Sequence, residues 1–148
     1  MWRQSEFVFF SVLTSVGALF CIEKNSKLFW ANDTIESKIM KLLIAGSRSI
    51  KNFDLTKYVP PNTTLIISGG ATGIDTLAEK FADTHIIPKQ IILPDYSLYG
   101  KQAPIVRNKL MVDLADPVLV IWDGKSHGAK ITADYAKKLN KLLNNIII

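Results

Sequence analysis

Short apolar runs alternate with segments of helical periodicity along most of this chain, and that alternation constrains the fold more than any other feature. Five runs are typical of buried strands: Lys41–Ala45, Thr64–Ile67, Lys89–Leu93, Pro117–Trp122 and Asn145–Ile148. The runs are largely apolar without a regular polar alternation, which favours strands covered on both faces of a parallel sheet.

The segments between these runs carry the spacing of amphipathic helices. One apolar stripe repeats at i, i+3, i+4, i+7 and i+8, and its members are Ile74, Leu77, Ala78, Phe81 and Ala82. Further helices are expected over Val106–Leu114 and Ile131–Leu142, and a shorter one over Ile50–Val59, stopped by Pro60-Pro61. Strands that alternate with helices predict an α/β three-layer sandwich with a mainly parallel sheet of about five strands.

Residues 1–39 precede this pattern and differ from it. Residues 7–22 form a stretch of 16 residues without a charge, which is shorter than the roughly 20 residues that a membrane-spanning helix needs. A signal peptide is a second interpretation, although Glu6 and the lack of a small-x-small cleavage site weigh against it. The third is an upstream extension, non-native or partner-binding, that precedes a domain over residues 40–148.

The charge of the chain points to anionic partners. The formal net charge is +5, and residues 1–39 hold four basic and four acidic residues, so the excess belongs to residues 40–148. Nucleotides, nucleic acids and membrane surfaces fit this charge, the last only if residues 7–22 are retained. Cys21 is the only cysteine, which excludes an intrachain disulfide, leaves cysteine-based metal sites unsupported and fits a cytoplasmic protein. Homo-oligomerisation stays open.

The glycine-rich and polar residues of the domain follow the predicted strands. In open α/β sheets, ligands bind outside the carboxyl ends of the strands. The strongest element is the segment SGGATGID, from Ser68 to Asp75, which ends a strand and opens a helix. Its glycines permit the close approach of a ligand, and the helix N-terminus offers N–H groups to a phosphate. A tight strand-to-helix turn is the alternative.

Three further loops carry polar groups of the same kind. Gly46-Ser47-Arg48 follows the first strand and suits a phosphate, because arginine can bind two oxygens at once. Asp95 and Tyr96 follow the third strand, where a carboxylate would accept from a ribose hydroxyl and a phenol ring would stack on a base. Residues 123–128 (DGKSHG) follow the fourth, with His127 as a candidate acid or base. Ordinary turns with solvated or packed side chains are the alternative at each loop.

In their order and spacing, four stretches resemble the small YspA-like branch of the SLOG superfamily. They are LLIAGSRSI (42–50), ISGGATGIDTLAE (67–79), LPDYSLYGKQAPIVRNKLM (93–111) and VIWDGKSHG (120–128). The resemblance covers residues 40–148 and implies a Rossmann-like fold that binds a nucleotide or nucleotide-derived ligand such as AMP, ADP-ribose or an NAD-derived species. The candidate pocket residues, from the loops and from the resemblance, are Gly46, Ser47, Arg48, Ser68, Gly69, Gly70, Ala71, Thr72, Gly73, Asp75, Asp95, Tyr96, Arg107, Asn108, Asp123, Gly124, Ser126 and Gly128.

The resemblance leaves the activity open. The related LOG-type phosphoribohydrolases carry P-G-G-x-G-T-x-x-E, with a catalytic glutamate, after their fourth strand. Aligning Gly128 with the last glycine puts Thr132 at the glutamate, and a hydroxyl cannot serve as a carboxylate base. Nucleotide binding, by a sensor or processing module, is therefore the leading expectation. One alternative is a single-stranded nucleic-acid binder with a basic last helix. The other is a hydrolase of N-glycosidic or phosphate bonds that uses Asp75, Asp95, His127 and Asp134.

Overall fold

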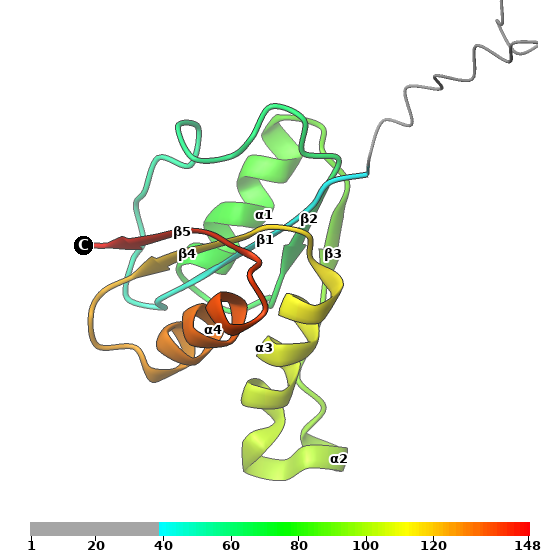
Figure 1. Ribbon diagram of the computed structural model, residues 1–148, viewed down its shortest axis with the longest axis vertical. Coiled ribbons are helices and arrows are strands. Elements are labelled where there is room, and N and C mark those ends of the chain that lie inside the picture. Colours follow the sequence, from blue (N-terminus) through cyan, green and yellow to red (C-terminus); the bar gives the residue numbers. More distant parts are fainter. Residues whose placement is uncertain (1–38) are drawn as a thin grey trace, which may run out of the picture. The chain divides into compact units, whose positions relative to one another are not determined.

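A five-stranded, entirely parallel sheet forms the centre of the structure (Figure 1). Its strands are β1 (Lys41–Gly46), β2 (Leu65–Ser68), β3 (Lys89–Ile91), β4 (Val118–Trp122) and β5 (Leu142–Ile147). The computed structural model describes residues 39–148. The predicted extension, with its apolar stretch over residues 7–22, lies outside the described residues apart from Ile39. The predicted α/β class is confirmed.

The order of the strands, β3-β2-β1-β4-β5, creates a switch point beside β1. The chain runs outward from β1 through β2 to β3, and then returns to place β4 on the other side of β1. Loops that leave the carboxyl ends of β1 and β4 therefore diverge to opposite faces of the sheet. Such a divergence is where open α/β sheets bind ligands.

Helices cover both faces of the sheet, so that the fold has three layers and is Rossmann-like (Figure 1). Helix α1 (Ile74–Thr84) packs on one face, and α3 (Ala103–Leu114) and α4 (His127–Lys138) pack on the other. The alternation of β1 explains this: Leu42 and Ile44 join the α1 cluster, whereas Leu43 and Ala45 join the α3–α4 cluster. All four side chains are buried.

The helix expected over Ile50–Val59 is absent, and that prediction was wrong. This stretch is irregular, with a turn at residues 56–58. The carboxylate of Asp54 accepts from the Thr56 amide at 3.0 Å, a local bond that competes with helical pairing. Ile50 and Leu55 are nevertheless buried against the α1 face, so the apolar residues were correctly taken as core but their periodicity was not helical.

The helix expected over Ile131–Leu142 ends earlier, at Lys138, and also begins earlier, at His127. Asn140 adopts a left-handed backbone with φ of 55°, which ends the helix. Leu142 accordingly opens β5, whose predicted bounds of Asn145–Ile148 were three residues late at the start.

Two further differences concern the segment between β3 and β4. A short helix, α2 (Tyr96–Tyr99), followed by a 3-10 turn (Gly100–Gln102), occupies what was expected to be a loop. Helix α3 starts at Ala103, and its Leu110 is exposed while Arg107 and Met111 are buried. None of the helices within residues 39–148 has the length and apolar composition needed to cross a bilayer.

Candidate functional site at the carboxyl ends of the strands

The loops after β1 and β2 pack directly against each other through glycines. A Cβ atom on Gly73 would lie 2.5 Å from the Ser47 carbonyl oxygen and 2.7 Å from the Arg48 Cα. A Cβ on Gly46 would lie 2.3 Å from the Ile121 carbonyl oxygen and 2.7 Å from the Ile74 side chain. Both glycines are therefore required by contacts inside the protein, whether or not a ligand also approaches them.

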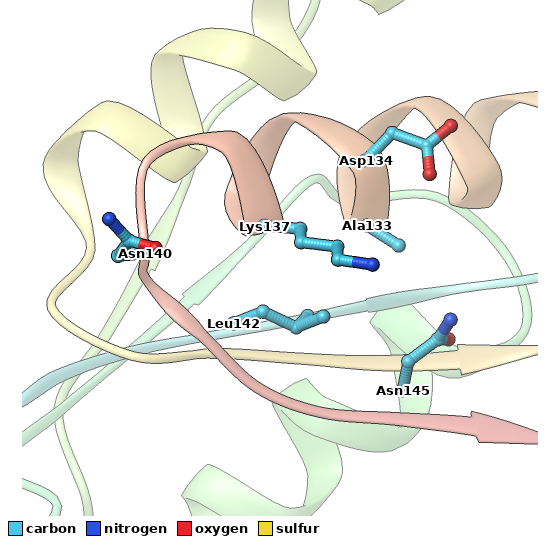
Figure 2. A pocket seen from close by; sticks show the side chains of 6 residues that line it. All are labelled: Ala133, Asp134, Lys137, Asn140, Leu142 and Asn145. Atoms are coloured by element: carbon cyan, nitrogen blue, oxygen red, sulfur yellow. The ribbon is translucent and has the colours of Figure 1, made fainter.

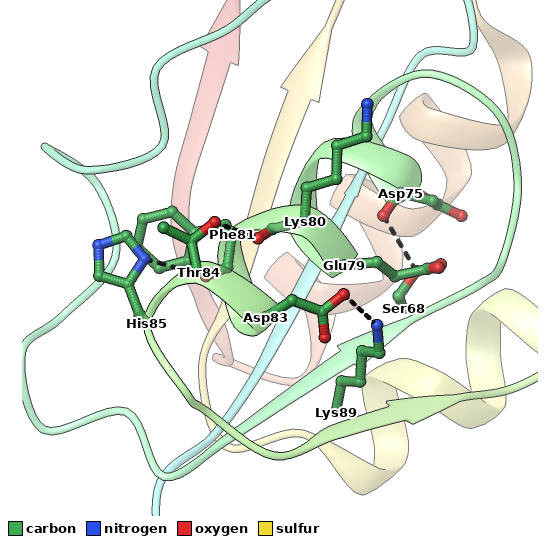
Figure 3. A network of polar contacts seen from close by, with 9 residues as sticks. All are labelled: Ser68, Asp75, Glu79, Lys80, Phe81, Asp83, Thr84, His85 and Lys89. Carbon is green, nitrogen blue, oxygen red and sulfur yellow. Dashed lines mark hydrogen bonds and ion pairs between the residues drawn. The ribbon is translucent and has the colours of Figure 1, made fainter.

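The polar groups of the SGGATGID segment hold this loop in shape (Figure 3). The Ser68 hydroxyl donates to a Glu79 carboxylate oxygen at 2.9 Å and accepts from the Gly70 amide at 3.2 Å. The Asp75 carboxylate accepts from the Ala71 amide at 3.2 Å. Asp75 thus closes the turn before α1. The N-cap residue of α1 is Gly73, which has no side chain to supply the usual capping bond.

Asp75 is nearly inaccessible to solvent, and its titration reflects this. Burial raises the pKa of Asp75 above its ordinary value of 3.8, although the Ala71 amide and the positive charge of Arg107 act in the opposite direction. A cation next to a buried carboxylate is the arrangement expected when that carboxylate is ionised.

Arg107 is the cation, and it reaches the loop from the second turn of α3. Its Nη1 donates to the Gly69 carbonyl and, at 3.2 Å, to the Ile92 carbonyl, and its Nε donates to the Asn108 side chain at 3.0 Å. Only 7% of the residue is exposed. The arginine therefore ties α3 to the ends of β2 and β3.

One nitrogen of Arg107 is not used by these bonds. Its Nη2 has no hydrogen-bond partner among residues 39–148. Within that part of the chain, no fully buried side-chain nitrogen or oxygen lacks a partner, so Nη2 is not completely enclosed. It is a donor available to a ligand.

Arg48 and Tyr96 lie within electrostatic reach of the same guanidinium. Burial lowers the pKa of Arg107, and the positive charge of Arg48 lowers it as well. The charges of Asp75 and Tyr96 raise the pKa of Arg107. Arg48 itself is exposed. The loop after β2 thus contacts the loop after β1 through Gly73 and contacts α3 through Arg107, whereas Arg48 and Tyr96 are linked to Arg107 by their effect on its pKa.

Asp123 links the loop after β1 to the loop after β4 at the switch point. Its backbone amide donates to the buried Ser47 hydroxyl at 3.0 Å, and its carboxylate accepts from the Ser49 hydroxyl at 2.6 Å and from the Ser126 amide at 2.8 Å. These bonds, with the Ser49 hydroxyl first, hold the pKa of Asp123 well below its ordinary range. Asp123 is consequently a rigid, ionised element of the loop junction.

The remaining predicted residues of the β4–α4 loop shape the start of α4, and the Gly128 carbonyl also accepts from the Asn108 side chain of α3 at 3.5 Å. Ser126 caps α4, with its hydroxyl 3.5 Å from the Ala129 amide, and Gly124 adopts φ of 72° in open space. The Gly128 carbonyl accepts from the Thr132 hydroxyl at 2.9 Å. Thr132 is buried, and its hydroxyl is occupied by this bond.

Several other candidates are exposed or have a separate structural role. Asp95 is the N-cap of α2 and accepts from the Leu98 amide at 3.0 Å. Thr72 and His127 are exposed. Asp134 lines an open cavity of about 520 Å³ between α4 and β5, whose lining includes no predicted pocket residue (Figure 2). Within residues 39–148, no group of three His, Cys, Asp or Glu residues is placed to hold a metal ion.

Three partners in this site were not foreseen from the sequence: the Ile92 carbonyl, Ser49 and Glu79. A carbonyl has no signature in a sequence. Ser49 sits beside the predicted Gly46-Ser47-Arg48 loop, and Glu79 lies one helical turn after Asp75, so the i, i+4 spacing was the available signal for it.

Comparison of the chain with protein-family models, with curated proteins and with solved structures gave no match.

Proposed function

We propose that this chain binds a nucleotide or nucleotide-derived ligand at the carboxyl ends of β1, β2 and β4, with Arg48 and Arg107 as the groups that bind its phosphate. The observation that carries the proposal is that both arginines border the Ser68–Asp75 loop: the Arg107 Nη1 donates to the Gly69 carbonyl, and the Arg48 backbone lies against Gly73. The positive charges of the two arginines oppose each other. An anion bound by both relieves that repulsion and accepts hydrogen bonds from the two guanidinium groups.

The distribution of arginine supports this assignment. The chain has 18 basic residues, of which three are arginines: Arg3, Arg48 and Arg107. Two of the three are therefore at one site, while lysines supply the rest of the positive charge. Arginine rather than lysine is the residue expected where planar, two-point recognition of a phosphate is needed.

Tyr96 and the loop amides complete the proposed pocket. The exposed Tyr96 ring, 59% accessible, offers a stacking surface for a base. Together with the order of the four loop motifs, this supports the finer assignment to the YspA-like branch of the SLOG superfamily and to AMP, ADP-ribose or an NAD-derived species as ligand. A cytoplasmic ligand sensor or nucleotide-processing module fits this proposal.

Binding is favoured over hydrolysis because the candidate acid and base residues are occupied or dispersed. Asp75 is held by the turn that it closes and by Arg107, Asp95 caps α2, and Asp134 faces the cavity beside β5. Thr132 cannot act as a carboxylate.

Calorimetric titration of the full chain with AMP, ADP-ribose, NAD and unphosphorylated adenosine tests the proposal. We expect a phosphorylated compound to bind and adenosine to bind more weakly. Arg48→Ala should weaken binding about tenfold or more, because a hydrogen bond to a charged group contributes roughly 1.5–3 kcal/mol. Arg48 has no hydrogen bond to lose within the described part of the chain, so the fold should be unaffected. Lys57→Ala, which removes another exposed cation, is the matched control. Absence of binding by every nucleotide, or equal binding by the Arg48 and Lys57 variants, would contradict the proposal.

A further inference from the structure

The two edges of the sheet differ in how they are protected. At one edge, β3 is only three residues long and lies between Pro88 and Pro94, and its Lys89 forms a 2.6 Å ion pair with Asp83. Short length, proline and lysine are the devices that keep an edge strand from pairing with another chain.

At the other edge, β5 has none of these devices. It is six residues long, and residues 142–148 (LLNNIII) contain neither charge nor proline. Leu143 is 45% exposed and Ile147 is 62% exposed. The register shifts between Val118 and Leu119, which leaves Leu143 as an extra residue in β5, and residues 144–147 then pair regularly with β4. A regular, uncharged and partly apolar edge is a template for a further strand.

The outward hydrogen-bonding groups of β5 can be assigned from its pairing. The Ile148 amide donates to the Trp122 carbonyl on β4 at 3.0 Å. In a parallel strand, alternate residues bond to opposite neighbours, so the N–H and C=O groups of Asn145 and Ile147 face away from β4. No strand pairs with that side of β5 within residues 39–148.

We propose that a second copy of this chain pairs antiparallel with the outer edge of β5, about a two-fold axis, and forms a homodimer with a continuous sheet. A two-fold axis normal to the sheet leaves α4 of both copies on the same side. The open cavity on that side lies between α4 and β5, as Figure 2 shows, with Asp134 and Lys137 above Asn145. The second copy's Ile147 lies on this side and covers the cavity.

The charges at the cavity favour a second copy over an unrelated strand. Asp134 and Lys137 are one acidic and one basic group on the same helix, one turn apart. Across a two-fold axis that passes near Asn145, which lines the same cavity, the two α4 helices run antiparallel, so that Asp134 of each copy lies towards Lys137 of the other. An isologous interface requires this kind of self-complementarity.

Sedimentation velocity of the full chain and of two matched variants tests the proposal. We expect a concentration-dependent dimer for the wild type and a monomer for Ile147→Lys, because a charge on an edge strand opposes pairing. Ile86→Lys introduces the same change at an isoleucine that is 91% exposed and precedes β3 at the other edge, and it should remain a dimer. Asn145→Pro removes an outward N–H and fixes φ, a change that edge strands tolerate where the N–H faces away from the sheet, and it should also be monomeric with an unchanged circular dichroism spectrum.

A monomeric wild type would overturn the proposal. A dimer that survives both Ile147→Lys and Asn145→Pro would overturn it too, because association would then use another surface. Hydrogen exchange gives an independent readout: the amides of Asn145 and Ile147 should exchange slowly in the dimer and quickly in the Ile147→Lys monomer, whereas the Ile148 amide should be protected in both.

Discussion

Substitution of Gly73 by alanine separates a packing role of this glycine from a ligand-binding role. Gly73 has φ of 85°, and an added Cβ would lie 2.5 Å from the Ser47 carbonyl oxygen and 2.7 Å from two backbone atoms of Arg48. With ψ of −127°, this backbone lies in a region that residues other than glycine rarely adopt, which costs such a residue about 1–3 kcal/mol, and overpacking against backbone costs about 1–3 kcal/mol more. We therefore expect Gly73→Ala to lower the free energy of unfolding by about 2–6 kcal/mol, a large part of the roughly 5–15 kcal/mol typical of a domain.

Gly100→Ala is the matched control for this variant. Gly100 has φ of 51° and ψ of −131°, close in type to the 85° and −127° of Gly73, but nothing lies within 4 Å of its Cβ position. Gly100→Ala should lose only the conformational part, about 1–3 kcal/mol. Urea unfolding followed by circular dichroism gives both values, and equal slopes against urea show that the same transition is compared.

Gly73→Ala should lose more unfolding free energy than Gly100→Ala. The difference measures how much the contact between the loops after β1 and β2 contributes to stability. Equal losses in the two variants would refute the reasoning, because the contact with Ser47 and Arg48 would then have no energetic consequence. A Gly73→Ala protein that kept its stability but lost nucleotide binding would assign the glycine to the ligand instead.

Three further substitutions test the bonds around the site. Arg107→Lys should lower the free energy of unfolding by about 2–4 kcal/mol, because lysine cannot bind both the Gly69 and Ile92 carbonyls while pairing with Asp75. A loss of stability no larger than that caused by a substitution at an exposed lysine would contradict this. Ser47→Ala should cost about 1–3 kcal/mol, since the Asp123 amide loses its buried acceptor, and urea unfolding measures it. For Asp75→Asn the expected effect depends on pH. The folded-state pKa of Asp75 is raised above 3.8, so its stabilising contribution is fully present below pH 3.8 and is lost as the pH rises through that raised value. Wild-type stability should therefore fall relative to Asp75→Asn as the pH rises through this window. Asp54→Asn should show the opposite trend, because the pKa of Asp54 is lowered, and urea unfolding across this pH range distinguishes the two.

The central strands could be predicted from the sequence because they are buried on both faces. β1, β2 and β4 consist almost entirely of apolar residues, so continuous hydrophobicity identified them within a residue or two. Helix α1 was equally clear, because its stripe from Ile74 to Ala82 faces one side of the sheet. The convergence of the loops followed from parallel topology alone.

What could not be predicted depends on single side-chain and backbone bonds. Asp54 replaces a helix with a turn, and the left-handed Asn140 moves Leu142 from a helix into a strand. Neither effect changes the hydrophobic pattern that was used to assign elements. Arg107 is the clearest case in the site, because an arginine in the middle of a helix is usually exposed, and only the position of the Gly69 and Ile92 carbonyls shows why this one is buried.

The burial of Arg107 also bears on how a ligand could be recognised. Its Nη1 and Nε are committed to the protein, so the side chain cannot reorient, and its Nη2 presents a donor in a fixed direction. Arg48 is exposed and free of such bonds within the described residues, and it can therefore adjust to the ligand. A fixed donor beside an adjustable one loses less conformational entropy on binding than two flexible cations would. If phosphate binding depends on one fixed and one adjustable arginine, Arg48→Lys should weaken nucleotide binding less than Arg107→Lys, because lysine cannot reproduce the geometry of the Arg107 guanidinium.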